Sequence, residues 1–321
     1  MKRVTVLMPL IKTYILELMR LFYWIPLRIL IQSIPLSLSY RLAEVAGWLL
    51  YTISKKKRER LEKGFKFLFG KGDYHKEIKR TFKNYALNSI EVFLYPLLNR
   101  EKVMGMVEYE GLENINQAIE RGKGVILLHS HFGNEEFLMP AIGYLGGYRV
   151  SQVASRWEPA RREGFFNRFP NMVRHYAFKM RIGYRETLPV NFIYIDRGLK
   201  DAYNVLKNNE LLLLAADGRE GTIWIEVELL GKKALYSQGP MKFALKTGAT
   251  VLPVFLVRQE NYKHRLIVET PLRLDVKMDI KQDIEVNMHK YVSLLGEYVK
   301  RYPCHYTKLF WLDMKYFKDF E

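Results

Sequence analysis

The chain has 321 residues, 49% of them hydrophobic, so it can bury a sizeable core in one large domain or two small ones. Its 51 Lys and Arg residues against 34 Asp and Glu residues give a formal charge of +17, which predicts attraction to nucleic acid, an anionic membrane surface or an acidic or nucleotide-linked ligand. The single cysteine, Cys304, excludes an intramolecular disulfide and fits a reducing compartment.

The N-terminal residues 1–35 are strongly apolar but interrupted by charge. They open with Met-Lys-Arg, and Lys12, Glu17, Arg20 and Arg28 break the apolar pattern. A spanning helix needs about 20 predominantly apolar residues, and a signal peptide needs a small-residue cleavage site that is not evident here. We expect an amphipathic helix lying in a membrane interface; a tilted single span and a helix packed on the protein's own core are the alternatives. The retained Lys and Arg residues favour the cytoplasmic side.

A basic run, Lys-Lys-Lys-Arg-Glu-Arg at residues 55–60, follows an apolar helical stretch at 42–53. Beside an interfacial helix such a run binds anionic head groups at about 1 kcal/mol per basic residue. A solvated helical face is the alternative. Residues 74–98 return to helical periodicity, so residues 1–100 are expected to form a helical N-terminal region with a membrane-interface segment.

From residue 107 onward, the pattern alternates between strands and helices. Strands are expected at 107–110, 125–131, 148–155, 211–216, 251–257 and 266–270, and helices at 112–121, 137–145, 199–207 and from 239 to a stop at 248. Residues 101–321 are therefore expected to form an α/β domain with a mixed, mostly parallel sheet flanked by helices.

The chemistry concentrates in residues 124–138, Gly-Val-Ile-Leu-Leu-His-Ser-His-Phe-Gly-Asn-Glu-Glu-Phe-Leu. The apolar run predicts a strand buried on both faces, with His129 and His131 at its carboxyl edge. Asn134 suits the N-cap of the next helix, and Glu135 and Glu136 suit its first turn, where the helix dipole favours negative charge. Ligands bind outside the carboxyl ends of strands in open α/β sheets, so this turn is a natural site.

His131 and Glu136 are the expected catalytic pair. On one ideal helix they would lie about 140° apart, but a strand-to-helix turn lets the carboxylate fold back under the imidazole. Such a carboxylate fixes the tautomer and stabilises the imidazolium that forms when the other ring nitrogen takes a proton. This is a general-base arrangement for activating a hydroxyl group.

Two later blocks accompany this motif. Residues 211–221 form an apolar run that ends in Asp217-Gly-Arg-Glu220-Gly, and residues 239–258 read as an amphipathic helix, a glycine stop and a strand containing Pro253. Together with His131-Phe-Gly-Asn-Glu-Glu136 they resemble the lysophospholipid acyltransferase superfamily, in the branch of the lipid A secondary (lauroyl and myristoyl) acyltransferases and the mycobacterial mannolipid acyltransferases. The resemblance covers residues from about 40 to 312. It implies that His131 is the base and Glu136 its partner.

The sequence departs from that branch at two places. Asp217-Gly218-Arg219-Glu220 stands where the branch has a second acid or Asp-Gln-Asp, and the usual Pro-Glu-Gln-Tyr and Trp-x-His-Arg-Arg tail is replaced by residues 303–306, Pro-Cys-His-Tyr, and 311–313, Trp-Leu-Asp. These changes concern the acceptor lipid more than the reaction. By resemblance, Arg219 is the first candidate for binding a phosphate of the donor or acceptor; a tight loop with a local ion pair is the alternative.

Residues 156–185 interleave arginines with aromatic residues. This combination suits a phosphate clamp beside an apolar surface, as a phosphorylated lipid or a phosphopantetheine donor requires. Stacking on single-stranded nucleic acid is an alternative without a supporting RNA-module signature, and an amphipathic helical hairpin with solvated arginines is another. The residues expected to bind substrate are Asn134, Arg156, Arg162, Arg168, Asp217, Arg219 and Glu220.

The resemblance implies a membrane-associated O-acyltransferase. It would move a fatty acyl chain from an acyl carrier protein or coenzyme A thioester to a hydroxyl of a glycolipid such as a lipid A precursor. The expected partners are that thioester, an anionic lipid acceptor and the membrane surface, with no nucleic acid. The thioester is a co-substrate, and no cofactor or metal is required. The expected location is the cytoplasmic face of the inner membrane, as a peripheral or single-pass protein.

Two other functions stay open at this point. His129 and His131, two positions apart on a strand, would point to the same face and could share zinc with Glu136, although a matching third ligand is missing from the sequence. The second is a basic membrane-binding protein without catalysis.

Overall fold

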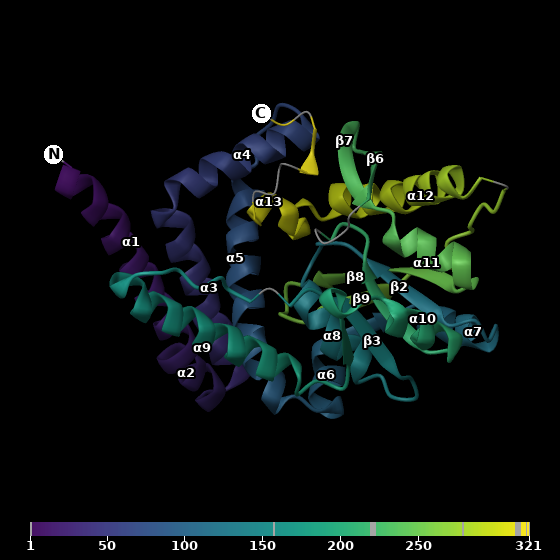
Figure 1. Ribbon diagram of the computed structural model, residues 1–321, viewed down its shortest axis with the longest axis horizontal. Coiled ribbons are helices and arrows are strands. Elements are labelled where there is room, and N and C mark those ends of the chain that lie inside the picture. Colours follow the sequence, from purple (N-terminus) through teal and green to yellow (C-terminus); the bar gives the residue numbers. More distant parts are fainter. Residues whose placement is uncertain are drawn as a thin grey trace.

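A computed structural model describes residues 2–156, 158–218, 223–277, 279–311, 316–318 and 320. A group of N-terminal helices stands beside a body built around a sheet (Figure 1). These helices are α1 (Lys2–Phe22), α2 (Arg28–Ser33), α3 (Leu36–Ile53), α4 (Lys55–Phe69), α5 (His75–Glu91) and α6 (Arg100–Met106). A π-helical turn, Tyr23–Leu27, joins α1 to α2 around Pro26, which cannot donate a helical hydrogen bond. The helices predicted at 42–53 and 74–98 are confirmed, the second ending in a 3-10 turn at Val92–Leu97.

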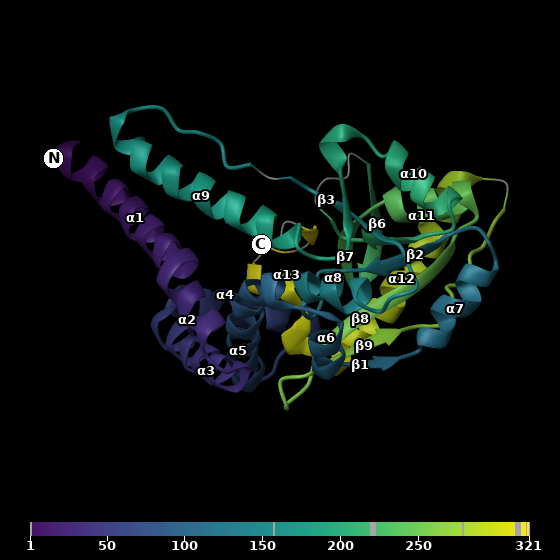
Figure 2. The same ribbon diagram turned by 90° about the horizontal axis from the view of Figure 1, so that it is seen from below.

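Helices α1 and α9 (Arg168–Arg185) run along each other and project from the body (Figure 2). The Tyr14 and Phe169 rings stack with centroids 5.7 Å apart, and Arg174 Nε lies 2.7 Å from a carboxylate oxygen of Glu17. Glu17 is buried, and Arg20 pairs with it as well. Two of the charges that interrupt the apolar N-terminal segment, Glu17 and Arg20, therefore belong to an ion cluster around the buried Glu17, and this cluster fastens α1 to α9.

Within the described ranges, no helix combines the length and apolarity needed to cross a bilayer. The interfacial position expected for residues 1–35 stays a prediction.

The basic run at 55–60 forms the start of α4, and part of it is tied to the protein. Lys57 Nζ lies 3.5 Å from the centroid of the Phe310 ring, and burial lowers the pKa of Lys57 to about 8. Arg58 donates to the Thr52 carbonyl at 2.7 Å, at the end of α3. This part of the run holds helices together and is neither a plain solvated face nor free for head groups.

The body contains a sheet of seven strands in the order β1-β9-β8-β2-β5-β3-β4. Neighbouring strands are parallel except β8 and β9, so the predicted mixed, mostly parallel sheet is confirmed. The strands are β1 (Val107–Glu110), β2 (Val125–His129), β3 (Val150–Ala154), β4 (Asn191–Tyr194), β5 (Leu211–Ala215), β8 (Thr250–Arg258) and β9 (His264–Val268). The strand predicted to reach residue 131 ends at His129, which leaves His131 in the following turn.

Helices cover both faces of the sheet. On one face lie α7 (Leu112–Glu120) and α8 (Glu135–Gly143); on the other lie α10 (Lys200–Lys207), α11 (Gly239–Thr247) and α12 (Ile280–Arg301). Because side chains alternate along a strand, β2 sends Val125 and Leu127 to the first core and Ile126 and Leu128 to the second. This double burial explains the continuous apolar run before the histidines.

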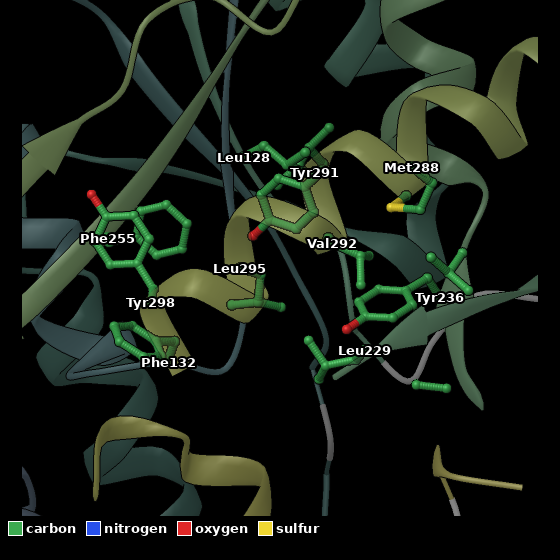
Figure 3. Packing of buried hydrophobic residues seen from close by; sticks show 14 of the residues in the cluster. Leu128, Phe132, Leu229, Tyr236, Phe255, Met288, Tyr291, Val292, Leu295 and Tyr298 are labelled. Carbon is green, nitrogen blue, oxygen red and sulfur yellow. The ribbon is translucent and has the colours of Figure 1, made fainter. Parts of the chain in front are cut away.

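Helix α12 and an antiparallel hairpin, β6 (Trp224–Leu229) and β7 (Lys232–Ser237), complete the second core. In Figure 3, Tyr291, Val292 and Leu295 of α12 lie among Leu128 of the sheet and Leu229 of the hairpin. A short helix, α13 (Thr307–Trp311), follows α12 and brings the chain back to the carboxyl edge of β2.

Candidate active site

The site forms where β2 and β5 end side by side. His131 lies two residues beyond β2, and Asp217 lies two residues beyond β5. Because the two strands are paired in parallel, their carboxyl ends bring both side chains to one edge of the sheet. His131 Nδ1 is 2.8 Å from Asp217 Oδ1, and the backbone N–H of His131 donates to both Asp217 oxygens at 3.1 Å. The carboxylate thus fixes both the ring and the turn that carries it.

The neighbouring charges in the site favour the charged forms of both Asp217 and His131. Burial alone would raise the pKa of the Asp217 carboxyl, but His131 and Lys308 hold it well below its usual range. Burial opposes the imidazolium, yet Glu135 and Asp217 outweigh it and raise the pKa of His131 from 6.5 to about 9. The pairing of His131 therefore stabilises the fold fully below about pH 6.5, and this contribution is lost as the pH rises through about 9.

Lys308 of α13 lies behind Asp217. Its ammonium group donates to the Asp217 carbonyl at 2.8 Å and lies 3.8 Å from Oδ2. Only 3% of the Lys308 side chain is exposed, so this cation is held next to the carboxylate and away from solvent. Asp217 is held from two sides, by an imidazole and by an ammonium group.

Glu135, the first residue of α8, faces the other nitrogen of the ring. Its Oε2 lies 3.5 Å from His131 Nε2. Burial raises the pKa of the Glu135 carboxyl, and the nearby Glu136 and Asp217 carboxylates act in the same direction, while His131 opposes them. A hydroxyl group that is to be deprotonated must reach Nε2 on this side, next to Glu135.

Glu136 does not take the place expected for it. It forms ion pairs with Arg181 and Arg185 of α9, with Arg185 Nη2 2.5 Å from Oε1. Burial opposes its charge, but the two arginines lower the pKa of Glu136 to about 2. Consecutive helical residues differ by about 100° in direction, so when Glu135 faces His131, Glu136 faces α9. The partner of the imidazole Nδ1 is Asp217, and Glu136 anchors α9 to the active-site helix.

Asn134 is the predicted N-cap, and this role is confirmed: its side-chain oxygen accepts from the Phe137 N–H at 3.2 Å. The amide nitrogen donates to Glu91, so both ends of the side chain are engaged within the protein. Glu91 also accepts from Arg258 at 2.6 and 2.9 Å and lies 3.1 Å from His264 Nε2. This buried cluster, Glu91, Asn134, Arg258 and His264, supports the turn that carries His131.

Three of the arginines expected to bind substrate lie within the described residues, and their contacts are away from the His131–Asp217 pair. Arg156 follows β3, with its guanidinium 5.5 Å from the centroid of the Tyr194 ring. Arg168 begins α9 and lies over Phe165, while Arg162 borders a cavity between α1 and α9. The remaining two expected residues, Arg219 and Glu220, lie outside the described residues.

His129 is buried at the end of β2, and burial together with the nearby His131 lowers its pKa to about 4. The zinc site predicted as an alternative from the sequence required these two histidines and Glu136. In the structure, Glu136 forms ion pairs with arginines. Across the described ranges, no group of three His, Cys, Asp or Glu side chains is arranged to hold a metal ion.

Two cavities meet at Glu135. The sheet-edge cavity, about 630 Å³, is lined by His129, His131, Gln152, Leu214 and Phe243 among others. The α1–α9 cavity, about 1,090 Å³, lies between α1, α5 and α9. Both border Glu135, Glu136 and Arg181. His131 itself lines the sheet-edge cavity, and Glu135, which faces His131 Nε2, lines both cavities.

Sequence reasoning missed the roles of Asp217, Glu135 and Lys308. For Asp217 a signal existed, because it stands two residues past an apolar strand, as His131 does, and paired strands would bring such positions together. Lys308 gives no comparable signal, since its burial depends on how α13 returns to the sheet.

The fold and this site define an α/β protein in which a histidine, held by an aspartate, lies at the carboxyl edge of a mixed sheet. The chain belongs to the bacterial lipid A biosynthesis acyltransferase family, whose model matches residues 11–318.

Curated relatives bear the name phosphatidylinositol mannoside acyltransferase. Those of two Mycobacterium tuberculosis strains are 28% identical over 179 residues, 54% of this chain and 52% of the relative. That of Mycolicibacterium smegmatis is 24% identical over 182 residues, 55% of this chain and 54% of the relative. The chain spans about half the length of the curated relatives it matches.

Proposed function

We propose that this protein transfers a fatty acyl chain from a thioester to a hydroxyl group of a membrane glycolipid. The observation that carries the proposal is the His131–Asp217 pair, 2.8 Å apart at the mouth of a cavity, in a chain of this family. No step of this reaction requires a cofactor.

His131 acts as the general base. Asp217 keeps the proton of the ring on Nδ1, which leaves Nε2 free to take the proton of the attacking hydroxyl. The hydroxyl oxygen forms a bond to the thioester carbonyl carbon, and the carbon–sulfur bond then breaks. The imidazolium returns its proton to the departing thiolate. Asp217, and behind it Lys308, keep the imidazolium oriented without taking part in the bond changes.

The acceptor enters from the side of the α1–α9 cavity in this proposal. Arg162 lines that cavity, and among the described residues its guanidinium has no hydrogen bond or ion pair, so it can meet a phosphate. Helices α1, α2 and α3 expose large apolar side chains, as does the segment that leads into α9. They include Ile15, Met19, Phe22, Ile29, Trp48, Ile53, Phe165 and Phe166.

An exposed apolar face beside an unpaired arginine suits a phosphorylated lipid presented at a membrane interface. A lipid A precursor and a mannoside of phosphatidylinositol both have this chemistry. The donor is a thioester of acyl carrier protein or coenzyme A, and the exposed basic residues at the start of α4, Lys55, Lys56 and Arg60, favour the cytoplasmic face of the membrane. Attachment through residues 1–35 completes the proposal.

The test is transfer of radiolabelled acyl groups from acyl carrier protein and from coenzyme A into a total membrane lipid extract, by wild type and by His131→Ala. We expect a new labelled lipid with wild type and none with His131→Ala, because the variant has no base at this position. Identifying the product names donor and acceptor together. Turnover retained by His131→Ala, or no labelled lipid from either donor with wild type, contradicts the proposal.

The pH dependence of the reaction should report the charge on His131. Since the base must be neutral, kcat/KM is expected to rise with pH with its midpoint near pH 9 in wild type. Glu135 raises the pKa of His131, so Glu135→Gln should move this rise to lower pH. Steady-state kinetics from pH 6 to 10 check this expectation. A wild-type rise centred near 6.5, or an unchanged profile in Glu135→Gln, contradicts the assignment.

A further inference from the structure

Two buried polar atoms, on side chains that line the sheet-edge cavity, lack hydrogen-bond partners among the described residues. They are Nδ1 of His129 and Oε1 of Gln152, and both are buried. His129 is 6% exposed, and neither side chain is used by the chemistry at His131. Buried polar groups in proteins are almost always paired, so two orphans in one cavity indicate a ligand that supplies hydrogen bonds.

Both side chains lie on the same face of the sheet. His129 pairs in register with Ala215 of β5, and Gln152 of β3 pairs with Leu213. Since paired residues and residues two apart share a face, His129 and Gln152 form a polar wall across β2, β5 and β3. Gln152 is half-buried and His129 is buried, so this wall leads outward from the reacting histidine across β3.

The rest of the cavity differs in character. Leu199, Leu214 and Phe243 line it and pack with the core on the opposite face of the sheet. The cavity therefore straddles the sheet edge, with an apolar part on one side and the polar wall on the other. An acyl chain fits the apolar part but has no group to bond with His129 or Gln152.

We propose that the polar wall formed by His129 and Gln152 binds the amide groups of a pantetheine arm, with the acyl chain of the same thioester in the apolar part. The assignment rests on the proposed acyl transfer. Pantetheine carries amides beyond an ethylene unit from the sulfur, so an amide falls close to a thioester held at His131. A neutral imidazole donates or accepts according to its tautomer, and the Gln152 oxygen accepts from an amide N–H.

The same arm occurs in coenzyme A and in acyl carrier protein, so the wall recognises the chemistry common to both donors. Acyl transfer from each should fall by a similar factor in His129→Leu if the arm alone is bound. A loss confined to one donor would show that the side chain contacts the carrier instead, and would overturn the assignment.

The decisive comparison uses two small donors with the same acyl chain, an N-acetylcysteamine thioester and a simple alkyl thioester of equal length without the amide. Wild type should prefer the amide donor by about tenfold in kcat/KM, the effect of one buried hydrogen bond. In His129→Leu and Gln152→Leu the preference should shrink toward one, and His129→Gln, which keeps a polar group, should restore part of it. Met139→Leu, in the same cavity, is the control that should preserve the preference.

Equal slowing of both donors by His129→Leu, or a wild type without any preference, overturns the assignment. Binding of free pantetheine by calorimetry gives a readout that does not depend on turnover, and it should weaken about tenfold in His129→Leu. Suppose that wild type transfers no acyl group but still binds pantetheine, and that His129→Leu weakens this binding. That result would contradict the proposed function and support the polar wall. If wild type does not bind pantetheine, the assignment of the polar wall is overturned.

Discussion

Asp217→Asn is expected to lower kcat for acyl transfer about a thousandfold while leaving the fold intact. The side chain keeps its size, but an amide at 2.8 Å from Nδ1 no longer demands a proton there and can hold the ring in the wrong tautomer. It also removes a carboxylate that raises the pKa of His131. The rate is measured with saturating thioester donor and lipid acceptor.

Two observations control this experiment. The pKa of His131, followed by NMR with His131→Ala to assign the signal, should fall in Asp217→Asn, and the circular dichroism spectrum should match that of wild type. A variant that keeps wild-type kcat, with His131 still titrating near pH 9, contradicts the role given to Asp217.

Glu91→Gln is expected to cost about 3–5 kcal/mol of unfolding free energy, the usual effect of removing one partner from a buried ion pair. Glu91 is 1% exposed, and Arg258, its partner at 2.6 Å, is 7% exposed. The variant leaves the guanidinium buried with its remaining polar contacts, to the Asn88 oxygen at 2.7 Å and the Tyr262 carbonyl. Denaturant unfolding of the variant and wild type measures the difference.

The matched control is Glu260→Gln. Glu260 pairs with Arg80 at 2.9 Å, but 91% of its side chain is exposed, so this change should alter stability by less than about 1 kcal/mol. A double variant, Glu91→Leu with Arg258→Met, should recover much of the loss because it removes both buried charges. Equal stability of Glu91→Gln and wild type would show that the cluster does not hold the fold.

The local parts of the site could be predicted from sequence. The apolar run at 125–128, the cap at Asn134 and the acids in the first helical turn are short-range patterns, and the structure has each of them. The sequence predicts Asp217 only as a substrate-binding residue, because its contact with His131 joins residues 86 positions apart and depends on the strand order. Spacing along the chain favoured Glu136, whereas the start of α8 at Glu135 turns Glu136 toward α9.

Other elements were missed for physical reasons. β4 has only one fully buried residue, Ile193, so it lacks the apolar run of a central strand. The β6–β7 hairpin alternates buried and exposed positions, which is typical of strands. The residues just before it favour a turn, and this turn pattern is stronger than the strand pattern. His264 and His305, far apart in the sequence from Glu91, are both buried, and each is bonded to the cluster around Arg258.

We infer that His131, held by Asp217, removes the proton of the acceptor hydroxyl. The most direct measurement compares the rate of labelled lipid formation by His131→Ala, Asp217→Asn and Glu136→Gln under one set of conditions. We predict no turnover by the first, a small residual rate for the second, and for the third a rate far closer to wild type. An inactive Glu136→Gln beside an active Asp217→Asn, or turnover by His131→Ala, would contradict the claim.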